Sequence, residues 1–186
     1  KTVPLEGIQA AIDAGQMLFG ENRIQEALPK LEALRDSAAG QSAAFHLIGH
    51  LQSNKAKHGP AFAMVESVDS VKLARALSRR SHDNLAILLE VNVAGEASKD
   101  GFREDELESA LRKIRTLPNL DVRGLMTVAP LATDPEQVRP HFRRLRELRD
   151  AFGLDALSMG MTNDYEIAIA EGATLVRIGR AIFGER

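Results

Sequence analysis

The stretch Leu175-Val176-Arg177-Ile178-Gly179-Arg180-Ala181-Ile182-Phe183-Gly184 decides the fold. It predicts a short apolar strand with one cation, Arg177, followed by a glycine and one turn of helix. A glycine here lets the backbone come close to a ligand. The unpaired N–H groups and the dipole at a helix N-terminus favour a phosphate. A glycine after a strand is more often only a turn, so the interpretation depends on what lies upstream.

Upstream of this stretch, apolar strands alternate with helices along the whole chain. Strict alternation is typical of a parallel sheet with right-handed crossovers. The short, apolar strands favour a closed barrel. An open doubly wound sheet is the alternative, but no early Gly-x-Gly-x-x-Gly pattern supports it. The predicted strands are 17–20, 45–49, 64–68, 85–93, 122–129, 156–160 and 174–178, and the predicted helices are 5–14, 24–34, 71–80, 103–116, 138–152 and 163–172.

Three local predictions concern the segments between these elements. Residues 37–42 are small and polar and predict a loop. Asp69-Ser70 predicts the N-cap of the helix 71–80. Asn163, followed three residues later by Glu166, resembles a capping box and predicts a helix start.

The seven predicted strands fall one short of the eight that a (β/α)8, or TIM, barrel requires. We therefore expect the first strand to precede Lys1. Lys1 would then stand at the C-terminal end of that strand, where barrel enzymes place their chemistry. The alternative is a solvated chain end. No linker or change in composition divides residues 1–186, so we expect one domain.

The composition is ordinary for a soluble globular protein. The 186 residues are 44% hydrophobic and 27% charged, with a formal net charge of −2 and no Cys. The absence of Cys excludes disulfides and thiolate chemistry. The charge offers no basic surface for nucleic acid or an anionic membrane, and no apolar run reaches the length of a membrane span. We expect a cytoplasmic protein with neither kind of partner.

The C-terminal ends of the predicted strands combine one lysine, Lys1, with two loops suited to phosphate. No cluster has the residue types of a metal site, and Ser158 has no obvious His–Asp pair to make it a nucleophile. A lysine beside a phosphate cradle suits a Schiff-base cofactor, because a buried lysine with a lowered pKa condenses with an aldehyde.

Seven blocks in this order resemble the pyridoxal phosphate (PLP) homeostasis proteins of the YggS/PROSC family, over essentially the whole chain. The blocks are FGEN with QE in 19–26, HLIGHLQSNK in 46–55, VDS in 68–70, SK with Gly101 in 98–101, RGLM in 123–126, SMGM with Asp164 in 158–164, and VRIG with IFG in 176–184. The first strand of that family ends in Ala-Val-Ser-Lys, which Lys1-Thr2 would continue.

The resemblance implies a barrel like the N-terminal domain of alanine racemase, without its second domain, that holds PLP as a Schiff base on Lys1. Arg177 would lie near the pyridine nitrogen and disfavour its protonation, which weakens the cofactor as an electron sink. The cofactor-binding residues that the resemblance implies are Lys1, Asn22, Ser158, Met159, Arg177, Gly179 and Arg180.

The phosphate, by this resemblance, is bound after the last two strands. Ser158 and Met159 supply one side, and Gly179 with the following residue supplies the other. Arg180 departs from the family pattern, because a small hydroxyl residue is frequent there. Only its backbone N–H is therefore expected to bind.

The family resemblance implies a PLP carrier or regulator without established catalysis. We also expect PLP-dependent apo-enzymes as partners and a monomeric state. One alternative is a PLP-dependent amino-acid racemase whose second acid/base is Tyr165 or a residue of a partner subunit. A further alternative is a PLP-independent, phosphate-binding barrel enzyme.

Several charged residues have simpler interpretations. Arg177 could form a structural ion pair with Glu90 or Glu21. His46 is equally consistent with a hydrogen-bonded core histidine and with a functional one. Lys55 and Lys99 are expected to be solvated loop charges or contacts without an assigned role.

Overall fold

The computed structural model describes residues 3–35, 37–96 and 99–184. Its seven strands form one sheet in the order β1-β2-β3-β4-β5-β6-β7, and every neighbouring pair is parallel. All seven predicted strands are confirmed, with ends that differ by a few residues. They are β1 Leu18–Glu21, β2 Ala44–Leu47, β3 Met64–Val68, β4 Leu85–Glu90, β5 Leu120–Met126, β6 Ala156–Met161 and β7 Leu175–Arg177.

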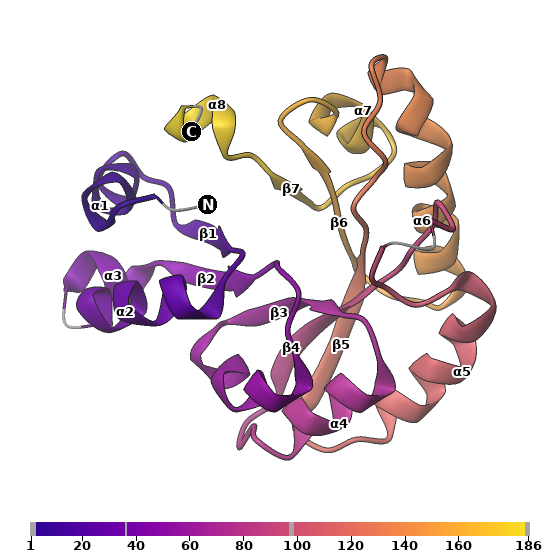
Figure 1. Cartoon of the computed structure of the whole chain (residues 1–186), viewed down its shortest axis with the longest axis horizontal. Coiled ribbons are helices and arrows are strands. Elements are labelled where there is room, and N and C mark those ends of the chain that lie inside the picture. Colours follow the sequence, from indigo (N-terminus) through magenta and orange to yellow (C-terminus); the bar gives the residue numbers. More distant parts are fainter. Residues whose placement is uncertain (1–2, 36, 97–98, 185–186) are drawn as a thin grey trace.

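The sheet curls, and the larger helices lie on its outer side (Figure 1). A doubly wound sheet would reverse its strand order at a switch point, whereas this order runs unbroken from β1 to β7. The barrel prediction is therefore confirmed. Within the described residues no ladder joins the two edges, β1 and β7. A strand before Lys1 stays a prediction, and Lys1 itself lies outside the described residues.

The helices follow the strands in alternation and cover the outside of the sheet. Within the described part of the chain, none is both long and apolar enough to cross a membrane. They are α1 Leu5–Asp13, α2 Ile24–Arg35, α3 Ala38–Ser42, α4 Val71–Ser78, α5 Glu104–Arg115, α6 Arg139–Ala151, α7 Tyr165–Ala170 and α8 Arg180–Phe183, with 3₁₀ helices η1 Ser53–Ala61 and η2 Pro135–Val138.

Helix α5 shows how the sequence pattern becomes packing. Leu107, Leu111 and Ile114 recur at intervals of three or four residues and are all buried, as expected for an amphipathic helix. The first turn is acidic and the last turn basic, which complements the helix dipole.

The two predicted helix starts have different outcomes. Ser70 caps α4 by accepting a hydrogen bond from the Leu73 N–H at 3.2 Å, as predicted. The capping box at Asn163 is wrong, because α7 begins only at Tyr165. Asp164 precedes that helix, and its carboxylate accepts the Met161 N–H at 2.5 Å. The side chain thus closes the turn after β6, a local bond that competes with capping.

The predicted loop over residues 37–42 is also wrong. It contains α3, whose N-cap Ser37 accepts a hydrogen bond from the Gly40 N–H at 3.0 Å. Small residues carry no hydrophobic period, so only the capping serine marks this helix in the sequence. The 3₁₀ helix η1 was likewise not predicted.

The inside of the barrel is polar near the C-terminal ends of the strands. Successive side chains of a strand point to opposite faces, so Ser158 of β6 points away from its buried neighbours Leu157 and Met159. The Ser158 hydroxyl donates to Glu66 of β3, which is not a neighbour of β6 in the sheet. Both side chains must therefore point into the curl of the sheet.

Candidate functional site

Arg177, the last residue of β7, is held by two neighbouring segments. Its Nη1 donates to the Ser158 hydroxyl at 2.7 Å, and its Nη2 donates to the Thr127 carbonyl at 2.7 Å. Thr127 is itself held in place by a hydrogen bond, because its hydroxyl donates to the Val91 carbonyl at 2.7 Å. A guanidinium has five N–H groups, and these two bonds leave others available to a ligand.

The electrostatic surroundings of Arg177 are acidic. Burial lowers the pKa of its guanidinium, and the carboxylates of Glu66, Glu90 and Asp164 oppose that shift. Arg177 is thus a cation whose charge is balanced from two strands and the turn before α7, rather than one half of a single ion pair.

Glu66 is the site residue that the sequence analysis missed. It is only 3% exposed. Its Oε1 lies 2.6 Å from Nδ1 of His46, and its Oε2 accepts the Ser158 hydroxyl at 2.5 Å. A buried carboxylate needs such partners. The signal in the sequence was the single acid in the strand MVESV, residues 64–68, which parallels the single cation in β7. His46 is buried and hydrogen-bonded.

The two predicted phosphate residues of β6 are fully buried, with no measurable exposure. Ser158 places its hydroxyl between Glu66 and Arg177. Met159 packs its side chain in the hydrophobic core. Met159 can therefore offer a ligand only its backbone.

The two predicted phosphate loops lie together at one end of the barrel. Met161 of β6 pairs with Arg177 of β7 in the ladder. Beyond the strands, Arg180 Nη2 donates to Asn163 Oδ1 at 3.0 Å. Gly179 is the N-cap of α8, and the first N–H groups of a helix have no partner within it. The Arg180 side chain therefore ties the two loops to each other.

Asn22 follows β1 at the same end of the barrel and is exposed. Its carbonyl lies so close to Gly49 that a Cβ at that glycine would overlap it, which brings the turns after β1 and β2 together. Glu21 pairs with Lys30 at 2.8 Å, so it is not the partner of Arg177. Lys1 lies outside the described residues, and the structure does not place it.

Glu90 is the last residue of β4. It lines a pocket of about 250 Å³ at the C-terminal ends of the strands. Burial raises the pKa of Glu90 to about 7, and the carboxylates of Asp100 and Asp69 add to the shift. Arg177 and His50 partly oppose the shift. Glu90 is thus a carboxyl that can either give or take a proton near neutral pH.

The contacts of Lys55 and Lys99 within the described residues do not include Arg177. Lys99 forms an ion pair with Glu96 at 2.6 Å and donates to the Val128 carbonyl at 3.4 Å. Lys55 lies in η1 and is partly buried. Neither lysine is assigned a role by these contacts.

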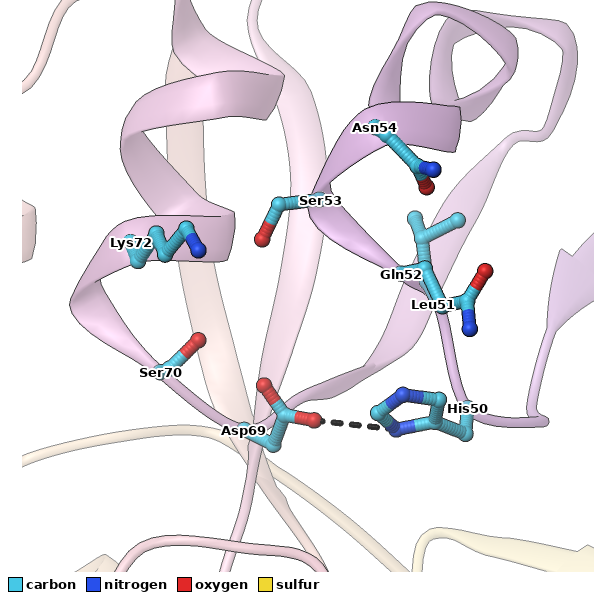
Figure 2. Close-up of a pocket in the computed structure, with 8 residues that line it drawn as sticks. All are labelled: His50, Leu51, Gln52, Ser53, Asn54, Asp69, Ser70 and Lys72. Atoms are coloured by element: carbon cyan, nitrogen blue, oxygen red, sulfur yellow. Dashed lines mark ion pairs between the residues drawn. The ribbon is translucent and has the colours of Figure 1, made fainter.

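A larger pocket, of about 470 Å³, opens where η1 and α4 begin (Figure 2). On its rim, His50 Nδ1 lies 3.1 Å from Asp69 and 3.2 Å from Asp100. The donor atoms of these three side chains lie within 4.8 Å of one another, a grouping that the sequence does not reveal. Exposed acidic groups commonly gather without an ion, and no other observation points to one here, so we assign no metal to the cluster.

Sequence relatives agree on one description. The family described as alanine racemase, N-terminal domain, matches residues 5–186. The pyridoxal phosphate homeostasis protein of Aquifex aeolicus is 44% identical over 196 residues, covering 100% of this chain and 84% of the relative. The protein of the same name from Pseudomonas aeruginosa is 44% identical over 195 residues, covering 100% and 82%.

Solved structures show the same fold. PipY of Synechococcus elongatus PCC7942 with PLP bound has a TM-score of 0.88 at 35% identity, covering 99% of this chain and 89% of PipY. A protein of unknown function from Bifidobacterium adolescentis has a TM-score of 0.86 at 42% identity, covering 95% and 79%. Alanine racemase of Clostridium difficile, at 12% identity and a TM-score of 0.75, covers 98% and 48% and shows the fold alone. The barrel, its polar interior and these full-length matches together show that the chain belongs to the family of pyridoxal phosphate homeostasis proteins, built on the alanine racemase N-terminal domain.

Proposed function

We propose that this protein binds PLP and serves PLP homeostasis as a carrier or regulator. The observation that carries the proposal is Arg177, a guanidinium anchored at two points at the C-terminal end of the barrel, two residues before Gly179. PipY, a relative across 99% of this chain, has been solved with PLP bound.

The guanidinium of Arg177 fits the unprotonated pyridine nitrogen of PLP. It can only donate hydrogen bonds, and only two of its five N–H groups are used by the bonds to Ser158 and Thr127. A ring nitrogen that accepts such a bond must keep its lone pair. PLP supplies an electron sink when bound, and a cation beside an unprotonated nitrogen weakens that sink. This arrangement favours holding PLP over catalysing a reaction with it.

The phosphate is assigned to the ends of β6 and β7. The family resemblance gives one side to Ser158 and Met159 of β6, and the other to Gly179 and Arg180 at the start of α8. The Arg180–Asn163 bond supports the assignment, because it holds the two loops together. A backbone turn that begins a helix is a suitable site for an anion.

The remaining contacts rest on the family resemblance. Lys1 is assigned the covalent bond to the cofactor, and Asn22 a place near its ring. A single domain over residues 1–186, a monomeric state, a cytoplasmic location and exchange of PLP with apo-enzymes belong to the same proposal.

Within residues 3–35, 37–96 and 99–184, no contact favours the racemase alternative. The Tyr165 hydroxyl donates to its neighbour Glu166 at 3.3 Å, and alanine racemase resembles this chain in fold alone. The names of the relatives and the PLP-bound PipY also favour PLP over a cofactor-independent barrel enzyme.

Absorbance tests the proposal. Adding PLP to the full-length protein should produce the visible band of a lysine Schiff base, which borohydride removes. Mass spectrometry after reduction should place the pyridoxyl group on Lys1, and Lys1→Ala should abolish the band. If the wild-type protein forms no band, the proposed function is wrong. If the band forms, deuterium exchange at Cα of added amino acids separates a carrier from a racemase.

A further inference from the structure

A continuous chain of polar contacts crosses the inside of the barrel from β7 to β2. Arg177 donates to Ser158 at 2.7 Å, Ser158 donates to Glu66 at 2.5 Å, and Glu66 lies 2.6 Å from His46. A guanidinium only donates and a carboxylate only accepts. The single hydrogen of the Ser158 hydroxyl is therefore committed to Glu66, and its oxygen to Arg177.

Glu66 is also the main electrostatic partner of Arg177. Among the carboxylates that counteract the effect of burial on the pKa of Arg177, Glu66 has a larger effect than Glu90 or Asp164. A buried carboxylate and a partly buried guanidinium that share one hydroxyl stabilise each other without touching.

We propose that Glu66 is a positioning residue for Arg177, acting through the Ser158 hydroxyl to hold the guanidinium against the pyridine nitrogen of PLP. The inference rests on the proposed function, since it gives Glu66 a part in binding PLP. Without Glu66, the hydroxyl is free to turn, and Arg177 loses the alignment of one of its two anchors together with its main opposing charge.

A second buried glutamate shows what a purely structural carboxylate looks like here. Glu171 is 4% exposed, against 3% for Glu66. It pairs directly with the guanidinium groups of Arg139, Arg143 and Arg146 of α6. Glu66 instead reaches its arginine through a hydroxyl, which takes up only one N–H and leaves others of that guanidinium available to a ligand.

A pair of ligands isolates the contact at the ring nitrogen. PLP and 1-deaza-PLP, in which C–H replaces that nitrogen, share the same aldehyde and phosphate. Full-length wild-type protein should bind PLP at least about tenfold more tightly than 1-deaza-PLP, as expected for a hydrogen bond from a charged donor. In Glu66→Gln the two affinities should come within about threefold of each other, because Arg177 loses its main opposing charge and a neutral amide holds the Ser158 hydroxyl less strongly than a carboxylate.

Two further variants make the comparison decisive. Ser158→Ala cuts the link while leaving the Glu66–His46 contact, so it should lower the ratio of affinities in the same way. Any role of Ser158 in phosphate binding cancels in the ratio, since both ligands carry the phosphate. Glu171→Gln makes the same chemical change at a buried carboxylate of the outer layer and should keep the wild-type ratio.

The outcomes separate this inference from the proposed function. A wild-type protein that binds PLP on Lys1, with folded Glu66→Gln or Ser158→Ala variants that keep its ratio of affinities, would overturn the positioning role alone. A wild-type ratio near one would also overturn it, because Arg177 would then not contact the nitrogen. Failure of the wild-type protein to bind PLP would overturn the proposed function itself.

Discussion

Glu66, Glu90 and Arg177 lie in strands that are otherwise mainly apolar. A charge inside a barrel is unfavourable unless other polar groups compensate it. Glu66 is compensated by hydrogen bonds, and Arg177 by both bonds and carboxylates. The negative charge of Glu90 is compensated least. Burial and two nearby carboxylates disfavour that charge and raise the pKa of Glu90 to about 7.

The raised pKa of Glu90 predicts a pH-dependent gain in stability for Glu90→Gln. The folded state binds the Glu90 proton up to about pH 7, whereas the unfolded state loses it near the ordinary value of 4.5. The contribution of Glu90 to the free energy of unfolding is thus fully present below pH 4.5 and is lost as the pH rises through 7. Relative to wild type, Glu90→Gln should gain up to about 3 kcal/mol between these limits.

Urea unfolding at about pH 4.5 and about pH 8 measures this gain. Glu32→Gln, at an exposed glutamate of α2, controls for the loss of one negative charge from the protein. A Glu90→Gln variant whose stability relative to wild type is the same at both pH values would contradict the prediction.

Helix α4 and the pair β5–β6 show how single positions set whole elements. The hydroxyl of Ser70 satisfies an N–H at the start of α4, beside the pocket formed with η1 (Figure 2). Gly124 of β5 faces Ala156 of β6, where the strands approach so closely that a Cβ would overlap the Ala156 carbonyl. Ser70 thus marks the start of helix α4, and Gly124 allows strands β5 and β6 to approach closely.

Replacing the cap of α4 should weaken the protein modestly. Ser70→Ala leaves the Leu73 N–H without its side-chain partner and should lower the free energy of unfolding by about 1 kcal/mol. Ser70→Thr keeps a hydroxyl and should recover most of that loss. Chemical denaturation of the three proteins measures the difference, and an equal loss in both variants would show that the cap is not the cause.

Adding a methyl group to β5 should be far more harmful. Gly124→Ala forces β5 and β6 apart and should cost about 3 kcal/mol or more. Gly153→Ala is the matched control, because a Cβ there meets nothing within 4 Å. The only cost to stability expected at Gly153 is that of its positive φ of 60°, about 1 kcal/mol. Thermal unfolding compares the two variants. Equal losses would mean that the close approach of the strands is not what requires glycine at 124.

Across the whole molecule, stability should be uneven around the sheet. β4 is paired on both sides, and its residues Ile87, Leu88 and Leu89 are fully buried. β7 is a three-residue edge strand with only partly buried side chains. The proposed PLP site lies beside β7, so the described strand nearest the proposed site is also the shortest.

Amide hydrogen exchange on this 186-residue chain should follow that gradient. The amides of β4 should exchange most slowly and those of β7 fastest among the strands, because local opening is easiest where few contacts are lost. PLP should slow exchange in β7 and at the start of α8 without changing β4. Protection in β7 equal to that in β4 before PLP is added would contradict the gradient.

Much of the fold follows from local patterns that the sequence shows directly. The strands alternate with helices, and Ser70, Gly179 and the leucines of α5 mark element ends and faces. Predictions failed where a side chain makes another local bond in place of a cap, as Asp164 does with the Met161 N–H, or where a hydrophobic period is absent, as in α3. The site was predictable where a charge interrupts an apolar strand, which identified Arg177 and could have identified Glu66.

The sequence by itself determined the order of the elements, the barrel, the family and the end of the barrel where a ligand belongs. These follow from periodicity and from motifs that lie within short stretches. The tertiary structure alone decided which groups meet. Glu66 and Ser158 are 92 residues apart in sequence, and Ser158 and Arg177 are 19 apart. The pairing of β6 with β7 brings Ser158 to Arg177. Only the curl of the sheet brings Ser158 to Glu66, because strands that are not neighbours can meet only across its inside.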